Sequence, residues 1–470
     1  MPPLPAQLPI TPFISPIHRE PFDKLPGSKS LTNRCLALEA LCEQPGTLKN
    51  VLFSEDTRLM MTALEKMGLG VISNEKEKNI TIHGRISDIS KPPGEVTPLH
   101  VGLAGTAARF LTAFCAAARS GIWRLDGLPQ MRRRPMRGLI EALRALGATV
   151  RNLGEEGFLP VEIHSCGLRG GEVTIDAGES SQMLSALLLV APEADSDVHI
   201  QLASPVRQPF VEMTMRLMKQ YGGLVDYDET TGKITVRHVS YKLNAFPHIE
   251  PDATAASYFL TLPLVTGGSI RIPGIVMDEN YRNMLQGDVR YINVLEKTGA
   301  QIIKKTEGTM VKCDRSIKLR AVTENFNEFS DTFLTLAAIA PLLDGTTRIH
   351  GIAHTRKQET DRVAGMAREL TRLGQRVHET EDALEITPDP EKMRALTQDA
   401  PIVIETHDDH RFAMSFAILG THDLHGDGRP WLTIDNPACC AKTFPHFFDA
   451  LESLRACPIE KINQGDQKKS

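Results

Sequence analysis

The sequence predicts an α/β protein of two globular domains, and three observations support this. The length of 470 residues exceeds what one hydrophobic core usually organises. Apolar helix patterns that open on a small, hydroxyl or acidic residue recur at intervals of 72 to 79 residues. Short alternating runs such as "EVTID" and "LEITP" supply strands between them. Six such units are too long for a solenoid, so we expect two compact domains of three units each.

The first helix of each unit opens at a recognisable position. The six starts lie near Ser30, Gly105, Ser180, Asp252, Asp331 and Asp409. A second amphipathic helix follows in each unit, and the first five of these, such as "DTRLMMTALEKMG" and "ETDRVAGMARELTRLG", end at Gly, a common C-terminal stop. Taken singly, a hydroxyl or acidic residue at such a start is usually only an N-cap. Several helix N-termini that face one cleft would instead form a site for a polyanion.

Composition limits the class of protein. The apolar content is 41%, the charged content 24% and the formal net charge −5, which argues against a nucleic-acid binder. The eight cysteines show neither a CxxC pair nor zinc-type spacing, so we expect reduced thiols and no metal site. The first residues do not resemble a signal peptide, and no apolar run reaches membrane-spanning length. We therefore expect a cytoplasmic protein.

The stretch "KLPGSKSLTNR" resembles a phosphate-binding loop but does not have its spelling. A nucleotide-binding loop places Lys directly after the second Gly of Gly-x-x-x-x-Gly-Lys. Here Ser28 separates Gly27 from Lys29, and Phe22 stands where the first Gly would be. The loop therefore predicts an anion site that is not a nucleotide site.

Other clusters could carry chemistry, although each also has a structural interpretation. Arg134 precedes Pro135, which places its guanidinium at a helix start. Glu359 and Arg362 share a helical face, where a surface ion pair is the alternative. A lone histidine at the position of His410 would usually belong to the core. The basic residues near the helix starts are Lys29, Arg34, Arg109, Arg132, Arg133, Arg134, Arg207, Arg362, Arg411 and Lys442.

Seven ordered motifs resemble those of the 5-enolpyruvylshikimate-3-phosphate synthase family. They are "LPGSKSLTNR", "GLAGTAARF", "MRRRPM", "SSQMLSALL", "KQETDR", "DDHRFAM" and "CCAKTFPHFF", and they span residues 24–453. The resemblance implies transfer of the enolpyruvyl group of phosphoenolpyruvate to shikimate 3-phosphate, without metal or cofactor. It implies a monomer that has neither a nucleic acid nor a membrane as partner. It also implies two domains of three βαβαββ repeats, with helix N-termini facing an interdomain cleft; we place them at residues 25–249 and at 1–24 plus 250–470.

The resemblance also implies roles for individual residues. The expected phosphoenolpyruvate ligands are Lys29, Gly105, Arg134, Gln182, Arg362, Arg411 and Lys442. The expected shikimate 3-phosphate ligands are Ser30, Arg34, Ser180, Ser181, Gln182, Arg207, Asp331 and Gln358. The expected catalytic residues are Lys29, Asp331, Glu359 and His410. In this scheme Asp331 lies near the attacking hydroxyl, and Glu359 protonates the methylene carbon.

Several positions depart from the family pattern. Leu103 and Phe110 replace an Asn and a Pro at the edge of the phosphoenolpyruvate pocket. On the acceptor side Phe210 replaces a Tyr, His354 replaces an Asn and Gln358 replaces a Lys.

With Gln358 the chain lacks the positive charge of the family lysine at that position. Arg207, in "SPVRQPF", offsets this loss of charge, and we predict that it is the main cation for the acceptor phosphate. The departures leave two alternatives open: a related enolpyruvyl transferase with another acceptor, and a non-catalytic binding protein.

Overall fold

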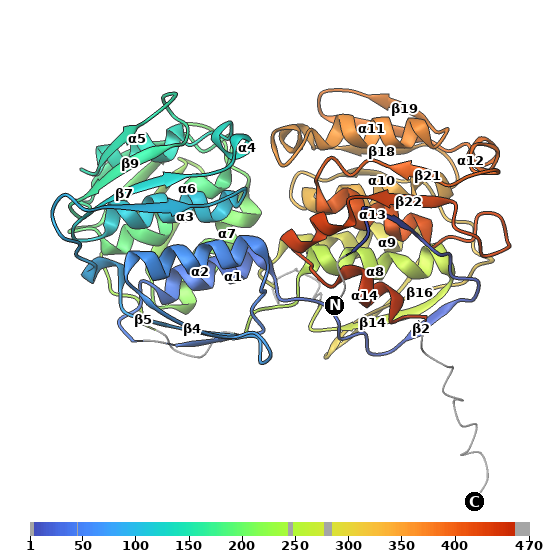
Figure 1. The fold of residues 1–470 in the computed structure, drawn as a ribbon, viewed down its shortest axis with the longest axis horizontal. Coiled ribbons are helices and arrows are strands. Elements are labelled where there is room, and N and C mark those ends of the chain that lie inside the picture. Colours follow the sequence, from blue (N-terminus) through green and yellow to red (C-terminus); the bar gives the residue numbers. More distant parts are fainter. Residues whose placement is uncertain (1–3, 45, 243–247, 277–283, 456–470) are drawn as a thin grey trace, which may run out of the picture.

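The computed structural model describes residues 4–44, 46–242, 248–276 and 284–455, and it has two lobes side by side (Figure 1). Helices and short strands alternate along the chain, and the strands of the described residues form six small sheets, five of them mixed and one entirely antiparallel. No helix in these ranges is long and apolar enough to cross a lipid bilayer.

The first lobe contains three sheets. Their strand orders are β3–β5–β4, β6–β7–β9–β8 and β10–β11–β13–β12. The strands are β3 (Thr47–Lys49), β4 (Gly70–Asn74), β5 (Asn79–His83), β6 (Val96–His100), β7 (Gly121–Asp126), β8 (Thr149–Asn152), β9 (Val161–Ser165), β10 (Gly171–Ile175), β11 (Val198–Leu202), β12 (Val225–Asp228) and β13 (Lys233–Val236). The helices are α1 (Lys29–Glu39), α2 (Glu55–Met67), α3 (Gly105–Ala117), α4 (Pro129–Arg132), α5 (Arg137–Ala145), α6 (Ser181–Val190) and α7 (Gln208–Gln220), with 3₁₀ turns at Ile86–Asp88 and Ala191–Glu193.

The second lobe contains the other three sheets. Their strand orders are β15–β16–β14–β2, β17–β18–β20–β19 and β1–β22–β21. The strands are β1 (Gln7–Pro9), β2 (Ile17–Arg19), β14 (Gly268–Pro273), β15 (Gln301–Lys305), β16 (Gly308–Cys313), β17 (Thr323–Asn325), β18 (Thr347–His350), β19 (Arg376–Glu379), β20 (Ala383–Thr387), β21 (Ile402–Ile404) and β22 (Leu432–Asp435). The helices are α8 (Ala253–Thr266), α9 (Tyr291–Thr298), α10 (Phe333–Ile339), α11 (Arg362–Arg372), α12 (Pro390–Leu396), α13 (His410–Gly420) and α14 (Phe447–Glu452), with 3₁₀ turns at Gly287–Arg290, Ser330–Thr332, Ala340–Leu342, Ala353–Lys357 and Pro437–Lys442.

The sheets share a pairing pattern. In each four-stranded sheet one parallel pair, such as β6 and β7, is extended by an antiparallel hairpin, such as β8 and β9. The sheet β3–β5–β4 has three strands, and an isolated parallel bridge from Lys49 to His248 lies along its open edge.

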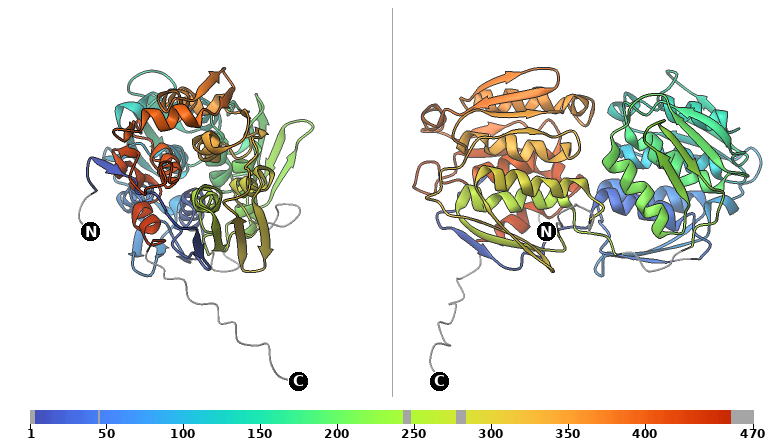
Figure 2. Two further views of the ribbon diagram at one scale, coloured as in Figure 1. Left: turned by 90° about the vertical axis from the view of Figure 1, so that its right-hand side faces the viewer. Right: turned by 180° about the vertical axis from the view of Figure 1, so that it is seen from behind.

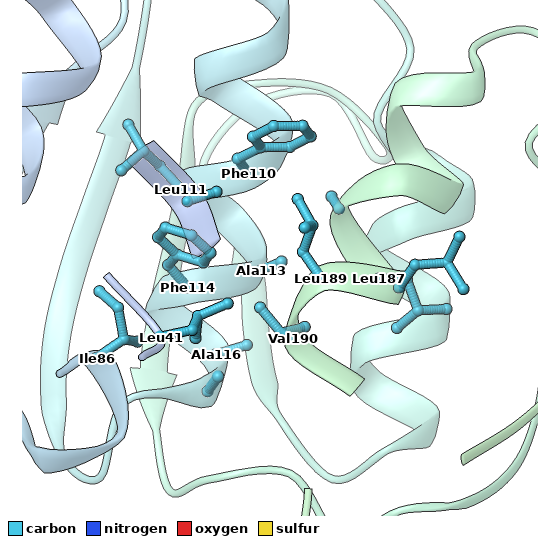
Figure 3. Close-up of a cluster of buried hydrophobic side chains, with 14 of the residues drawn as sticks. Leu41, Ile86, Phe110, Leu111, Ala113, Phe114, Ala116, Leu187, Leu189 and Val190 are labelled. Carbon is cyan, nitrogen blue, oxygen red and sulfur yellow. The ribbon is translucent and has the colours of Figure 1, made fainter. Parts of the chain in front are cut away.

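Apolar helices fill the interior of each lobe. Every residue of α3 is buried, as is every residue of α8, α10 and α13, because their sequences are apolar on all faces. In the first lobe α3 packs on α6, with Phe110 and Phe114 near Leu187 and Leu189 (Figure 3). Burying each such side chain contributes roughly 1.5–3 kcal/mol, so these helices set the positions of the loops that precede them.

The N-terminal segment packs with the second lobe, although the first lobe follows it in sequence. Strand β1 pairs antiparallel with β22, and β2 pairs parallel with β14 (Figure 2). Ile10, Phe13 and Phe22 are buried in the hydrophobic core of the second lobe. The chain passes between the lobes near Gly27 and again near Pro251, and these two residues form an antiparallel bridge. A β-carbon on Gly27 would lie 1.9 Å from the backbone oxygen of Asn50, so only glycine fits where this crossing segment passes the end of β3.

Five of the six expected helix starts agree with the structure to within one residue. The first, third, fourth and sixth helices begin at Lys29, Ser181, Ala253 and His410, and α3 begins at Gly105 as expected. In the fifth unit a 3₁₀ turn over Ser330–Thr332 precedes α10, so Asp331 lies in that turn rather than in the α-helix.

Candidate active site

A polar cavity lies between the lobes, and residues of both lobes line it. It is lined by Lys29, Ser30, Arg34, Thr106, Arg109, Arg134, Pro135, Glu179, Ser180, Ser181, Gln182, Arg207, Phe210, Asp331, His354, Lys357, Gln358, Glu359, Arg362 and Arg411. Eight of these side chains are Lys or Arg, and three are carboxylates. This excess of positive charge is local, because the whole chain carries a formal net charge of −5. The cavity therefore favours anionic ligands.

The opening loop places Lys29 at the first turn of α1. The Ser28 hydroxyl accepts from the backbone N–H of Leu31 and caps the helix. Lys29 Nζ lies 3.4 Å from Asp56 Oδ2, and the Lys29 backbone N–H donates to Asp252 Oδ2 at 3.2 Å. Because Asp252 caps α8, this bond ties the loop to the second lobe.

Arg34 is held rigidly in the wall of the cavity. Its Nε donates to Thr214 Oγ1 at 2.8 Å, and an Nη donates to Ser185 Oγ at 3.2 Å. The guanidinium lies 5.6 Å from the ring centre of Phe110 and 5.7 Å from that of Phe210. Burial lowers the pKa of Arg34 to about 10, so the side chain stays cationic at neutral pH.

Arg134 lies directly over the start of α3. A β-carbon on Gly105 would approach an Nη of Arg134 to 2.6 Å, so glycine at this position is what allows the guanidinium to lie so close to the helix N-terminus. Nearby Arg109 is fully buried and donates to the carbonyls of Gly105 and Pro135. Burial, and then Arg134, lowers its pKa. Backbone N–H groups and cations therefore converge on this side of the cavity.

Arg207, the residue before α7, lines the same cavity as Ser180, Ser181 and Gln182. Among the described residues neither Arg207 nor Arg134 has a carboxylate within ion-pair distance. Burial lowers the pKa of Arg207, and Asp331 partly offsets that effect. A buried guanidinium without a counter-ion is costly unless an anion binds beside it.

Three departures from the family pattern, Phe210, His354 and Gln358, line the same cavity as Arg207. His354 Nε2 lies 2.8 Å from Ser330 Oγ, and burial, followed by the charge of Arg207, lowers the His354 pKa to about 4. This imidazole is therefore neutral near pH 7. Lys357 extends across to Glu179 of the first lobe at 2.9 Å. It forms an exposed ion pair rather than replacing a cation at position 358.

The cations of the second lobe are paired with carboxylates. Arg362 donates to Asp409 Oδ2 at 2.7 Å, Asp331 Oδ1 at 3.1 Å and Glu359 Oε2 at 2.8 Å. It also donates to Gln358 Oε1. The guanidinium N–H groups of Arg362 are thus occupied by acidic and amide side chains. A bound carboxylate could take the place of those that face the cavity.

Two further ion pairs complete this network. Arg411 donates to Asp331 Oδ2 at 2.6 Å, and Lys442 Nζ donates to Glu359 Oε1 at 2.9 Å. Lys442 is buried beside the cavity wall rather than among the residues that line it. Each of the two predicted catalytic carboxylates is therefore held between two cations.

The network determines the charge state of those two carboxylates. Burial acts to raise the pKa of Asp331, but Arg411 and Arg362 outweigh it and hold the pKa below its ordinary value. Burial likewise acts to raise the pKa of Glu359, but Lys442, Arg362, Arg134 and Lys29 outweigh it, and the pKa lies well below its usual range. Both groups are ionised in this state of the site.

His410 does not line the cavity, although we expected it among the catalytic residues. It is the first residue of α13 and fully buried, and neither ring nitrogen has a hydrogen-bond partner among the described residues. Burial and the adjacent Arg411 lower its pKa, so the ring is neutral. This position suits a packing residue behind Arg411 better than a group that transfers protons.

Sequence reasoning missed the role of Asp409, which orients Arg362 and Arg411. This carboxylate is fully buried. It receives Arg362 through two oxygens, at 2.7 and 3.3 Å, and the backbone N–H of Arg411 at 2.9 Å. Its position directly before His410 and Arg411 was interpreted only as a helix start, because an N-cap and an ion-pair partner look alike in sequence.

Asp288 was also missed. It lies in the 3₁₀ turn before α9 and helps line a second, smaller cavity, which shares Lys29, Asp331 and Arg411 with the first. Thr254 Oγ1 donates to it at 2.9 Å. Burial, followed by the charge of Asp331, raises its pKa to about 7.

Comparisons with known proteins agree with this geometry. The family model described as EPSP synthase (3-phosphoshikimate 1-carboxyvinyltransferase) matches residues 23–451. The 3-phosphoshikimate 1-carboxyvinyltransferase of Opitutus terrae is 55% identical over 454 residues, which cover 96% of this chain and 98% of that protein. The chloroplastic enzyme of Petunia hybrida is 39% identical over 440 residues, covering 91% and 82%.

Solved structures show a similar fold. The structure of EPSP synthase from Acinetobacter baumannii superposes with a TM-score of 0.75 and covers 95% of this chain and 98% of that one. Its 24% identity supports the mixed α/β fold rather than individual contacts. The family match and the relatives that align along nearly the whole chain carry the assignment, and this chain belongs to the EPSP synthase (3-phosphoshikimate 1-carboxyvinyltransferase) family.

Proposed function

We propose that this protein transfers the 1-carboxyvinyl group of phosphoenolpyruvate to the 5-hydroxyl of shikimate 3-phosphate and releases inorganic phosphate. The observation that carries the proposal is the charge of the cavity wall, where eight cations face three carboxylates. Each substrate has one carboxylate and one phosphate monoester, so together they bring about five to six negative charges at pH 7. The local excess of positive charge therefore matches the pair of substrates rather than either one alone.

The unpaired cations of the first lobe suit the two phosphates. We assign the phosphate of phosphoenolpyruvate to Arg134, Lys29, Gln182 and the backbone at Gly105, with Lys442 behind them. This assignment is supported by the proximity of Arg134 to Gly105 at a helix start.

We assign the acceptor phosphate to Arg207, Ser180, Ser181 and Gln182. Ser30, Arg34 and Gln358 would hold the rest of the acceptor. Arg207 carries this assignment, because among the described residues it has no carboxylate within ion-pair distance and it lines the same cavity as the hydroxyls at the start of α6. Loss of the family lysine at position 358 is compatible with a phosphate there, since Arg207 supplies a planar, bidentate cation.

The paired cations of the second lobe suit the carboxylate of phosphoenolpyruvate. Arg362 and Arg411 each present a guanidinium to Asp331, and a planar substrate carboxylate can take the place of that side chain. When it does so, Asp331 loses part of the positive field that keeps its pKa low. Its pKa then rises, and it becomes a stronger base toward the acceptor hydroxyl.

The same exchange prepares Glu359 to act as an acid. Its low pKa depends on Lys442, Arg362, Arg134 and Lys29. A bound phosphate and carboxylate neutralise these cations, so burial then dominates and the pKa of Glu359 rises. The substrates themselves would thus convert Glu359 from a carboxylate into a proton donor.

The reaction then proceeds by addition and elimination. The acceptor oxygen adds to C2 of phosphoenolpyruvate as Asp331 takes its proton, and Glu359 gives a proton to the methylene carbon. In the second step the methyl group returns a proton to Glu359, and the bond from C2 to the phosphate oxygen breaks. The proton that Asp331 took from the acceptor hydroxyl passes to the departing phosphate, which leaves as hydrogen phosphate and restores the Asp331 carboxylate. Lys29 and Arg134 stabilise the charge that develops on the leaving phosphate.

We propose that the chain forms two domains, residues 25–249 and residues 1–24 plus 250–470, each of three βαβαββ repeats. The two hydrophobic cores and the six sheets support this division. Helices α1, α3 and α6 begin at the cavity from one side, and α10, α11 and α13 begin near it from the other. Closure about the two chain crossings would assemble the site around both substrates.

The test is phosphate release by purified protein supplied with phosphoenolpyruvate, with and without shikimate 3-phosphate. We expect release only with both, together with the enolpyruvyl product in the mass spectrum. Phosphoenolpyruvate binding without turnover would favour a different acceptor, and failure to bind either compound would favour a non-catalytic protein.

A further inference from the structure

A second cluster of ligand-type side chains lies outside the substrate cavity. Glu369 belongs to α11, and Glu405 and His407 belong to the segment between β21 and α13. One ligand atom from each of the three lies within 4.8 Å of the others. None of them lines the substrate cavity, and the proposed reaction gives them no role.

Two buried atoms in this cluster lack hydrogen-bond partners. The Glu369 side chain is fully buried, and its Oε2 accepts from Arg372 at 2.6 Å and from the Glu405 backbone at 3.2 Å. Its Oε1 has no hydrogen-bond partner among the described residues, and neither has Nε2 of His407. These two atoms lie 3.8 Å apart, which is too long for a hydrogen bond. Buried polar atoms without partners often mark the place of an ion.

The imidazole ring is oriented for ligation. Glu405 Oε1 lies 3.3 Å from His407 Nδ1, within ion-pair distance, and Nε2 on the other side of the ring lies 3.8 Å from Glu369 Oε1. The ring also packs edge-on against Phe412, at 5.3 Å between centroids, beside the backbone of Gly365. A carboxylate that fixes the second ring nitrogen is the usual companion of a metal-bound histidine. Two lone pairs that face each other in a buried space repel unless a cation lies between them.

The donor set also suits a cation. Two carboxylates, Glu369 and Glu405, lie at the cluster, and Arg372 pairs with Glu369 at 2.6 Å. Nitrogen and carboxylate ligands together suit a divalent transition-metal ion, whereas Mg²⁺ and Ca²⁺ favour sites made only of oxygen.

We propose that Glu369 Oε1 and His407 Nε2 bind a divalent transition-metal ion of the zinc class, with Glu405 orienting the ring and closing the solvent side. The ion would have a structural effect. It would join α11, which begins at Arg362, to the segment that leads into Arg411. Metal at this site would thereby fix the positions of Arg362 and Arg411 relative to each other without contacting either side chain.

The test uses the full chain, freed of metal by a chelator and titrated with zinc chloride in a calorimeter. Cys166, an exposed thiol, is replaced by Ser in every sample so that it cannot bind zinc. The test variant is His407→Gln, which keeps the Glu369–Arg372 pair intact. The control is His164→Gln, which removes another histidine–carboxylate pair, with Nε2 3.0 Å from Glu162, that has no third ligand nearby.

We expect one equivalent of zinc to bind the parent and the His164→Gln protein, and the affinity to fall about 10–100-fold in His407→Gln. Zinc should also raise the Tm of the first two proteins and leave that of His407→Gln unchanged. Cobalt in place of zinc should give visible absorption in the parent and in His164→Gln, and this absorption should be absent from His407→Gln. Absence of zinc binding in the parent, or equal binding in His407→Gln, would overturn the proposal, because the unpaired atoms would then be filled by a proton or the metal would lie elsewhere.

Discussion

Replacing Arg207 with Ala is the sharpest test of the acceptor site. Arg207 lines the cavity together with Ser180 and Ser181, and the described residues provide no carboxylate within ion-pair distance of it. The substitution therefore removes a cation from the bound state without leaving an unpaired acid in the free protein. Because a hydrogen bond to a charged group is worth about 1.5–3 kcal/mol, we expect the KM for shikimate 3-phosphate to rise about 10–150-fold.

The assay is steady-state phosphate release, with each substrate varied while the other is held constant. The KM for phosphoenolpyruvate should change less than about threefold, since its proposed ligands remain. Arg207→Lys should recover part of the affinity, because it keeps the charge but loses the bidentate geometry. The matched control is Lys357→Ala, which removes an exposed cation paired with Glu179 and should have less than about a fivefold effect. An unchanged KM for shikimate 3-phosphate in Arg207→Ala would refute the assignment.

Three further predictions concern the second lobe. Glu359→Gln should lower kcat about 10²–10⁴-fold while calorimetry shows shikimate 3-phosphate affinity within about threefold, and near-full turnover would exclude it as the proton donor. Asp409→Asn should raise the KM for phosphoenolpyruvate and lower stability to urea by about 3–5 kcal/mol, because Arg362 loses a buried counter-charge. The control Asp361→Asn keeps an N-cap side chain on α11 and loses only a half-exposed ion pair with Arg356, so it should cost about 1 kcal/mol or less. The pKa of His354, about 4 in the folded protein against an ordinary 6.5, means that the unfolded chain binds the extra proton first, so stability falls as pH drops from 6.5 toward 4. In His354→Asn this acid-dependent loss should shrink by up to about 3 kcal/mol at pH 4, and identical urea midpoints for both proteins across that range would contradict the assignment.

Much of the fold could be predicted because its signals are local. Helix starts depend on a cap and on an apolar pattern that begins beside it, so Asp252 and Asp409 could be recognised in the sequence as helix starts. The predicted helix start of the fifth unit was less accurate, since the choice between a 3₁₀ turn and an α-helical turn at Asp331 depends on packing. The N-terminal strands could not be predicted at all, because their partners, β14 and β22, lie far away in the sequence.

The site divides in a similar way. Lys29, Arg134, Asp331, Glu359 and Arg411 were selected from motifs, and the structure brings them together around one cavity or its rim. Their charge states were beyond sequence reasoning, because each pKa depends on the distance to partners from other units. His410, a motif residue adjacent to Arg411, is buried, and its catalytic role stays a prediction. The roles of these residues, the monomeric state and the cytoplasmic location remain predictions.

The pairing of the first strand with the last has a consequence for biosynthesis. On the ribosome, β1 emerges before any other strand, yet its partner β22 spans residues 432–435. At about 5–20 residues per second, roughly 20–90 s separate the two strands, and during that time the first lobe can fold completely. The nascent segment around Ile10 and Phe13 must meanwhile stay exposed, with its apolar side chains uncovered. A slower elongation rate, or a bulky fusion ahead of residue 4, would therefore affect the yield of the second lobe far more than that of the first.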